Sequence, residues 1–266
     1  FLHGAAVTIH KAQGSQWETV QVFAPDLYAA AMAGRVPENT LLSHDLFEGT
    51  FARAGLASDV EVVEEFPARQ DVDARRMQRW VRGDWQLLPW IVGQRPALGG
   101  ISAVNRWKMI DNLRRSLLAP MTLLTLFAGW LLPSPQALGW TVAVCGLLAL
   151  PRLITLPLAL LPGRGGIASR SHVQALLGDV KIAAAQVALS LGLLADTAAR
   201  MLGAIGLTAV RLVTGRHLLQ WVTGAQAGRG DRPGLLAAYL QKAGGVLLGL
   251  GACGLAVAVN PSVWPL

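Results

Sequence analysis

The sequence predicts a mixed fold, in which an α/β part is followed by an α-helical membrane region. The chain has 266 residues, of which 53% are hydrophobic and only 15% are charged. Its mean hydropathy of +0.43 is high for a water-soluble protein. After residue 115 the apolar residues gather in long runs with few charges, whereas the earlier part alternates between strand-like and helix-like periods.

The net charge of +7 lies entirely in the apolar half. Residues 1–115 hold 13 Lys or Arg and 13 Asp or Glu, whereas residues 116–266 hold 10 and 3. Basic residues beside apolar spans are typical of membrane proteins, in which they set the orientation, and this placement argues against a nucleic-acid footprint. The two cysteines, Cys145 and Cys253, lie inside apolar runs, so we expect small core residues and no disulfide framework.

Residues 1–33 differ from the rest. The segment AAVTIHKAQGSQW, which begins at Ala5, resembles a motif of superfamily 1 DNA helicases related to the exonuclease V alpha subunit. The residues alone predict a strand, a turn at Gly14 and a second strand over 20–23. The 266 residues contain no G-x-x-x-x-G-K-[ST] phosphate loop. We therefore expect a helicase-like fragment over 1–33, to which we assign no role, and a junction of two unrelated coding segments near 32–35.

An acid opens the next predicted helix. Asp45 precedes apolar residues at helical spacing, and Gly55 ends the pattern. Because Glu48 follows three residues later, Asp45 fits the N-cap of a capping box. A cap would also fix the direction of the carboxylate, so capping and a catalytic base are compatible interpretations. Residues 59–65 alternate as a short strand does, and Pro67 ends it.

The helix predicted over 73–88 has two distinct faces. One face carries apolar side chains: Met77, Val81, Trp85 and Leu88. The other carries Arg76, Arg79 and Gln86, with Trp80 at its edge. A charged stripe is usually a solvated face and an aromatic one is usually core. At the boundary, however, an indole can stack on a sugar ring while guanidinium groups bind a diphosphate.

Two motifs in this region resemble those of the processive inverting glycosyltransferases, which include cellulose, chitin and hyaluronan synthases. Ser43-His44-Asp45 resembles their Thr-Glu-Asp, and Arg76-x-x-Arg79-Trp80 resembles their Gln-x-x-Arg-Trp, with Arg in place of Gln. The chain is more similar still to cyclic β-1,2-glucan synthases. Three segments carry this similarity: SHDLFEGTFARAG, EEFPARQ and QRWVRGDWQLLPW. That similarity runs from about residue 35 to the C-terminus.

The resemblance implies that 34–115 is the C-terminal part of an α/β glycosyltransferase catalytic domain and that 116–266 is its membrane region. It implies UDP-glucose as donor, a growing glucan chain as acceptor, and Mg²⁺ or Mn²⁺ as cofactor. Asp45 would be the catalytic base. The substrate-binding residues would be Arg76, Arg79, Trp80, Asp84 and Gln86.

The same resemblance places further parts of the enzyme outside this sequence. The uridine-binding strands and the metal-binding Asp-x-Asp are expected upstream, and a phosphorylase-like domain is expected downstream. Asp71-Val72-Asp73 matches Asp-x-Asp by its letters but follows the base, which is the wrong order, so we assign no metal ligand. The chain opens with neither Met nor a signal peptide. We therefore expect a fragment that is inactive alone.

The second half predicts three to four apolar helices. Residues 117–132 and 138–161 are expected to span the membrane around a neutral loop, with Trp130 and Trp140 at the far interface. Residues 182–194 have basic residues on both sides in the sequence and predict a helix lying in the interface. Residues 244–259 form the last apolar run. Arg152 interrupts the second run, and whether it faces protein, a glucan path or the interface stays open.

The last run also contains Gly249-x-Gly251-x-x-Gly254, which copies a dinucleotide-binding fingerprint. No strand and crossover surround it, so we expect helix packing through Gly245-x-x-x-Gly249 instead. Taken together, the sequence predicts part of a multi-pass glucosyltransferase of the bacterial inner membrane, with its catalytic part in the cytoplasm. The alternatives are a nucleic-acid-binding helicase remnant fused to a membrane scaffold, and a scaffold without chemistry.

Overall fold

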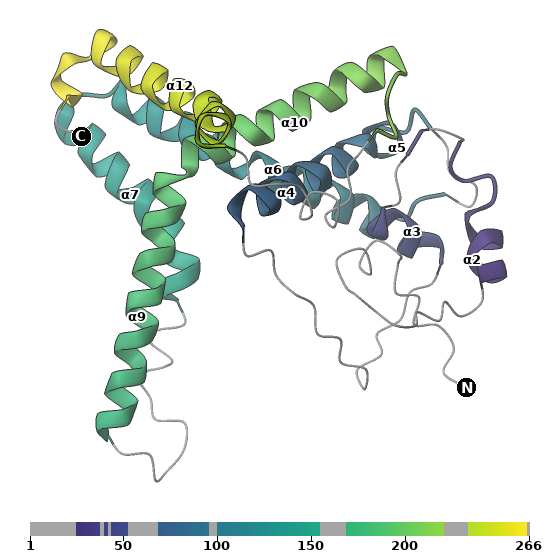
Figure 1. The fold of residues 1–266 in the computed structure, drawn as a ribbon, viewed down its shortest axis with the longest axis horizontal. Helices are drawn as coiled ribbons and strands as arrows, with labels where there is room; N and C mark the ends of the chain where they lie inside the picture. The colour runs from purple at the N-terminus through teal and green to yellow at the C-terminus, as the bar shows by residue number, and fades with distance from the viewer. Residues whose placement is uncertain are drawn as a thin grey trace. The chain divides into compact units, whose positions relative to one another are not determined.

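A computed structural model of the chain describes residues 25–37, 40–41, 44–52, 69–95, 100–154, 169–220 and 234–264. Every regular element in these ranges is a helix (Figure 1). The elements are α2 (Pro25–Met32), α3 (Asp45–Phe51), α4 (Gln70–Gln86), α5 (Leu88–Ile91), α6 (Ala103–Trp130), α7 (Ser134–Leu153), α9 (Ser169–Gly192), α10 (Leu194–Thr214), α12 (Leu235–Val259) and the 3₁₀ helix η1 (Pro261–Val263). The strands expected before residue 24 and at 59–65 lie outside the described residues.

The chain divides into two compact units. One unit comprises residues 1–117 and 200–234, and the other comprises 118–199 and 235–266. The division falls inside α6 and α10, so each of these helices contributes one part to each unit. The first unit contains every candidate site residue, and the second contains the helices that could cross a membrane.

An aromatic cluster forms the core of the first unit. Phe47 of α3 and Trp90 of α5 are almost completely buried, and their rings meet edge to face at 5.3 Å between centroids. Met109 and Leu113 of α6 complete the cluster with Leu87. Because rings of this size bury large apolar areas, the contact fixes α3 against α5 and the first part of α6.

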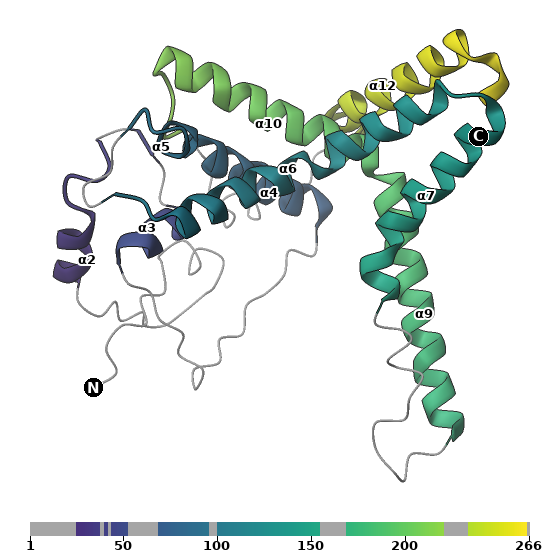
Figure 2. The ribbon, with the colours of Figure 1, turned by 180° about the vertical axis from the view of Figure 1, so that it is seen from behind.

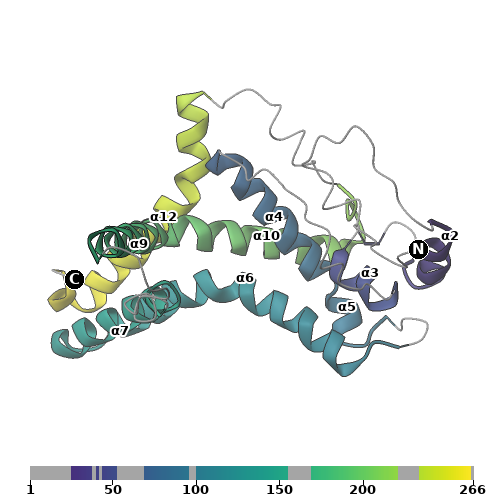
Figure 3. The ribbon, with the colours of Figure 1, turned by 90° about the horizontal axis from the view of Figure 1, so that it is seen from below.

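Helix α4 occupies nearly the range that the sequence predicts, beginning and ending two or three residues earlier. At its start, the guanidinium of Arg69 donates to both carboxylate oxygens of Asp71, at 3.1 and 2.8 Å. This bond holds the pKa of Asp71 below its usual value. Val81 is buried against Met201 and Ala204, and Figure 3 shows α4 crossing α10 at this contact. Met77, on the predicted apolar face, is less buried than Val81, with 36% exposed.

Helix α3 also differs in one detail. The residue at the N-cap is His44 and not Asp45, which is the first residue inside the helix. The capping interaction is carried by Glu48, whose Oε1 accepts the backbone N–H of His44 at 2.9 Å. Asp45 is therefore not the N-cap residue of α3.

In the second unit, α7 and α9 lie side by side (Figures 1 and 2). The turn between α6 and α7 is joined to the end of α12 by polar contacts. The Asn260 side chain donates to the carbonyls of Trp130 and Leu132 at 3.1 and 2.6 Å, and the Ser134 hydroxyl donates to the carbonyl of Ser262 at 2.9 Å. These bonds satisfy carbonyls that a helix end leaves without partners.

The two tryptophans beside this turn donate hydrogen bonds between α6 and α7. The indole N–H of Trp130 donates to the Thr141 hydroxyl at 3.1 Å, and that of Trp140 donates to the Thr125 carbonyl at 2.8 Å. A Cβ added at Gly129 would lie 1.9 Å from the Trp140 ring, so glycine is required for the two helices to approach here. Their predicted position at the membrane interface stays a prediction.

Three described helices are long and apolar enough to cross a membrane, over residues 134–151, 170–192 and 236–259. The run predicted at 117–132 is not among them. It forms the second part of α6, and the stretch between Arg115 and Trp130 is shorter than the roughly 20 residues that a span needs. The run at 182–194, predicted to lie in the interface, belongs largely to α9. That helix starts at Ser169, well before the apolar run, and so reaches the length of a span.

Close packing through glycine in α12 is confirmed. A Cβ added at Gly245 would lie 2.4 Å from the Cα of Asp196, and one at Gly249 would lie 3.3 Å from the Cβ of Ala195. Both partners belong to the first turn of α10. An ion pair between Lys242 and Asp196, with 3.9 Å between nitrogen and oxygen, lies beside this contact. The glycines therefore serve helix packing and not nucleotide binding.

This contact predicts opposite effects for two alanine substitutions in α12. Gly245→Ala should lower stability by about 1–3 kcal/mol, because the methyl group overlaps the α10 backbone. Gly251→Ala meets no atom within 4 Å and should leave stability unchanged or raise it by about 0.5–1 kcal/mol through helix propensity. The measurement is the apparent melting temperature of the detergent-solubilised chain. Equal melting temperatures for the two variants would contradict the packing.

Candidate functional site

The exposed side of α4 brings three of the predicted substrate-binding residues together. The Arg76 guanidinium lies 4.9 Å from the centroid of the Trp80 ring, close enough for a cation–π contact. Its Nη2 also pairs with Oδ1 of Asp73 at 3.2 Å. Trp80 is 41% exposed, so part of its ring stays open to a ligand. The result is a partly accessible aromatic surface with a cation over the ring.

Arg79 connects this surface with Asp45. Burial lowers the pKa of the Arg79 guanidinium, the charge of Arg76 lowers it further, and the Asp45 carboxylate acts in the opposite direction. The carboxylate that starts α3 is therefore within electrostatic range of Arg79 on α4. Asp45 lies 31 or more positions before Arg76 and Arg79 in the sequence, yet its charge acts on Arg79.

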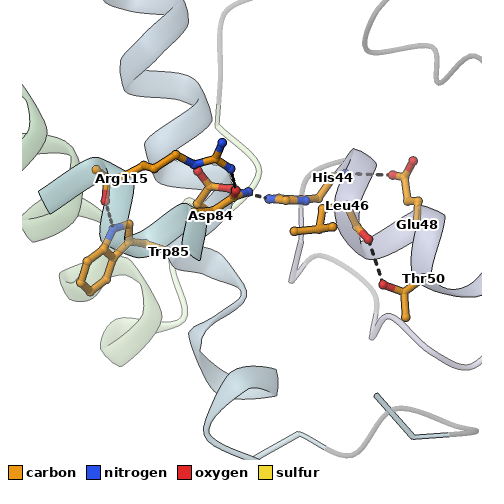
Figure 4. A network of polar contacts seen from close by, with 9 residues as sticks. His44, Leu46, Glu48, Thr50, Asp84, Trp85 and Arg115 are labelled. Carbon is orange, nitrogen blue, oxygen red and sulfur yellow. Dashed lines mark hydrogen bonds and ion pairs between the residues drawn. The ribbon is translucent and has the colours of Figure 1, made fainter. Parts of the chain in front are cut away.

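Asp84 binds two neighbouring segments (Figure 4). Its Oδ1 accepts hydrogen bonds from Nε2 of His44 at 3.0 Å and from Nδ2 of Asn112 at 2.7 Å. Asn112 in turn accepts a hydrogen bond from the Arg115 guanidinium. The side chains of His44 and Asp84 are only 10% and 17% exposed. Asp84 therefore joins the start of α3 to α4 and α6 in a partly buried environment.

Trp85 lies on the opposite side of α4 from Trp80 and has the structural role that the sequence predicts. It packs against both apolar clusters of the first unit. Its indole N–H donates to the Ser116 hydroxyl at 2.9 Å, and that hydroxyl donates to the carbonyl of Leu113. Both the ring and its polar atom are thus used in holding α4 to α6.

At the end of α4, Gln86 and Arg82 hold the segment that follows α10. The Gln86 amide donates to the Leu218 carbonyl at 2.7 Å, and Arg82 donates to the Gln220 carbonyl at 2.7 Å. Arg211 also donates to Gln220, so the two arginines lie close together. Burial lowers the pKa of Arg82, and the charge of Arg211 lowers it further. Gln86 was expected on the polar stripe with Arg76 and Arg79, and this is wrong, because the segment after α10 covers it and leaves 1% exposed.

The described residues do not fit the divalent metal that the resemblance implies. Nowhere in the described ranges do three His, Cys, Asp or Glu side chains lie together as a metal site requires. Asp71 and Asp73 are each paired with a nearby arginine, Arg69 and Arg76. No step below is therefore assigned to a metal held by these residues.

The sequence pattern gave no role to His44 and did not single out Asn112. The contact between His44 and Asp84 joins residues 40 positions apart, and no periodicity reports such a pair. One sequence signal did point to Asp84: it follows Trp80 by four residues and so lies on the same face of α4. The motif Ser43-His44-Asp45 likewise placed a histidine directly before the predicted base.

Comparison with known proteins agrees with the residues quoted above. Over 212 residues the chain is 42% identical to the cyclic beta-(1,2)-glucan synthase NdvB of Rhizobium meliloti (strain 1021), a match that covers 77% of this chain. Most of this chain is thus homologous to part of a cyclic β-(1,2)-glucan synthase. We call the matched residues the glucan synthase segment. This segment corresponds to only 7% of the length of that relative.

Outside the glucan synthase segment, the helicase resemblance is also confirmed. The family model of the UvrD-like helicase C-terminal domain matches residues 3–35. Matches to two unrelated families agree with the expected junction near residues 32–35. The matched range overlaps the described residues only from Pro25 onward, at α2.

The two tryptophans of α4 should respond differently to truncation. Trp85→Ala should destabilise the chain by about 3–5 kcal/mol, because it empties a site shared by two clusters and removes the bond to Ser116. Trp80→Ala should leave the melting temperature nearly unchanged, because Trp80 is 41% exposed and belongs to neither apolar cluster described above. Thermal unfolding of the two detergent-solubilised variants compares them directly. If Trp80→Ala unfolds the protein and Trp85→Ala does not, the two faces are assigned the wrong way round.

Proposed function

We propose that the glucan synthase segment is part of a membrane-embedded inverting glucosyltransferase that makes cyclic β-1,2-glucan from UDP-glucose. The observation that carries this proposal is the contact of Arg76 with the exposed ring of Trp80, beside Arg79, on which the charge of Asp45 acts. A carboxylate, two guanidinium groups and an exposed indole are the groups needed to handle a hydroxyl, a diphosphate and a sugar ring. The identity to a named glucan synthase supports the same activity.

In this proposal each group has one task. Asp45 takes the proton of the acceptor hydroxyl as that oxygen attacks the anomeric carbon of the donor glucose. Arg79, with Arg76, stabilises the charge that develops on the departing diphosphate. Trp80 forms the floor on which the acceptor sugar stacks. A divalent ion would supply further charge stabilisation at the diphosphate, from ligands that we place outside these residues.

Asp84 and Gln86 have a supporting role in this proposal. Their polar groups already contact His44, Asn112 and the Leu218 carbonyl. These contacts support an assignment in which both residues shape the site and the arginines and Trp80 contact the substrate. Their direct binding to substrate, predicted from the resemblance, is not needed for the reaction.

The proposal also covers architecture and location. Residues 34–115 would belong to an α/β glycosyltransferase domain on the cytoplasmic side of the bacterial inner membrane, where UDP-glucose is available. The basic residues of the second half support that orientation. The alternative, a nucleic-acid-binding helicase remnant on a membrane scaffold, is supported only by the match at 3–35. We give that segment no part in glucan synthesis.

The first test replaces the matching segment of the Rhizobium meliloti enzyme by the glucan synthase segment of this chain. The exchanged enzyme should transfer radiolabelled glucose from UDP-glucose, whereas the 266-residue chain alone should not. Asp45→Asn in the exchanged enzyme should reduce turnover at least about 1000-fold, because an amide of the same shape cannot accept the proton. Near-normal turnover by Asp45→Asn would rule out its role as the base. Transfer by the isolated chain would show that the segment is a complete enzyme.

The second test concerns the sugar-stacking surface. In the exchanged enzyme, Trp80→Ala should reduce glucan synthesis strongly, and Trp80→Phe should keep part of the activity because a smaller ring still offers a stacking face. Thr50→Val is the matched control, since the Thr50 hydroxyl donates to the Leu46 carbonyl within its own helix. Glucose transfer and thermal stability should be measured side by side. Full activity of Trp80→Ala would show that the acceptor sugar does not stack on Trp80.

A further inference from the structure

We infer that His44 and Asp84 are positioning residues, which act by fixing the direction in which Asp45 presents its carboxylate. This inference rests on the proposed function of Asp45 as the base. Its observation is that the residue directly before Asp45 is held at its side chain and at both polar groups of its backbone. Neither residue is required to touch the substrate.

Three hydrogen bonds hold His44. Its Nε2 binds Oδ1 of Asp84 at 3.0 Å, its backbone N–H donates to Oε1 of Glu48 at 2.9 Å, and its carbonyl accepts the backbone N–H of Glu48 at 2.9 Å. The last two bonds are local to α3 and set its first turn. The first bond is the one that orients this turn relative to α4, where Arg76 and Arg79 lie.

The acceptor of that bond is itself fixed. Asp84 accepts from Asn112 of α6 at 2.7 Å as well as from His44. The ring of His44 also lies against the backbone of α4, because a Cβ added at Gly83 would be 3.5 Å from its Cδ2. The imidazole is therefore confined by a charged acceptor and by the helix surface. A partly buried, charge-assisted bond of this kind is directional and stronger than a neutral one.

The geometry also defines which nitrogen of the His44 ring donates a hydrogen bond. Since a carboxylate accepts, Nε2 carries the proton of this bond. The Nδ1 atom is buried and has no hydrogen-bond partner among the residues that the structure describes. The donor at Nε2 is thus the polar atom of the ring that the described contacts use. Glutamine places an amide nitrogen at a similar reach, whereas alanine and leucine place none.

Loss of this bond should change orientation and not folding. Helix α3 is attached to the core separately by Phe47, which is completely buried against Trp90. That contact stays when the imidazole is removed. What changes is the angle of the first turn of α3, and with it the distance between the Asp45 carboxylate and the acceptor hydroxyl. Catalysis is sensitive to such shifts, since a displacement of ~1 Å can cost about 100-fold in rate.

The experiment uses the exchanged glucan synthase described above, with UDP-glucose as donor. His44→Ala and Asp84→Ala should each lower kcat roughly 10- to 100-fold and leave the KM for UDP-glucose within about twofold. The double variant should be no worse than the weaker single variant, because both remove the same bond. His44→Gln should recover most of the lost rate, whereas His44→Leu should not. Thr50→Val is the control on α3.

The results separate this inference from the proposed function. An inactive exchanged enzyme, or an active Asp45→Asn variant, contradicts the proposed function and this inference with it. If Asp45→Asn is inactive but His44→Ala turns over normally, only the positioning role is wrong. Melting temperatures of the 266-residue variants give the remaining check. Activity that falls only in proportion to stability, with no recovery in His44→Gln, would assign His44 a purely structural role and overturn the inference.

Discussion

The carboxylate of Asp84 is the interaction that orients the candidate site within the first unit. It lies in the middle of the polar contacts of α4 and binds one side chain from the segment before α3 and one from α6. The next two residues make similar contacts: Trp85 binds Ser116 of α6, and Gln86 binds the Leu218 carbonyl after α10. Three consecutive residues of α4 thus connect it to three different segments. Helix α4 can present its arginines in fixed positions because its other faces are held in this way.

A different constraint governs the second unit. Its long helices expose many large apolar side chains, including Leu147, Ile182, Leu189, Leu247 and Leu250. In water such a surface would drive aggregation, whereas in a bilayer it meets lipid chains at no cost. Helix contacts in lipid depend on close backbone approach, because burying leucine gains little there. The contact of Gly245 with the α10 backbone and the contact of Gly129 with Trp140 follow this rule.

The sequence predicted local features well and long-range ones poorly. The range of α4, the core role of Trp85 and the packing by Gly245 could be predicted because each depends on spacing within one helix. The burial of Gln86 could not, because it depends on a segment 132 residues away that covers one position. The 36% exposure of Met77 could not be predicted either, because a periodic pattern gives the direction of a side chain and not how far its neighbours cover it. The length of α9 was missed because polar residues of its first turns hide the start of the helix.

The electrostatics of the candidate site favour an anionic ligand. Arg79 is half-buried, and both its burial and the nearby charge of Arg76 lower its pKa, so the charged form is less stable there than in water. A single carboxylate, Asp45, opposes this effect. A diphosphate bound between the two guanidinium groups would add at least two negative charges and would offset the repulsion between them. When the diphosphate leaves, the repulsion returns and raises the free energy of the empty site, so this repulsion favours the bound state. In the proposed reaction, the same pair of arginines would therefore favour the charged donor and would also retain the charged product.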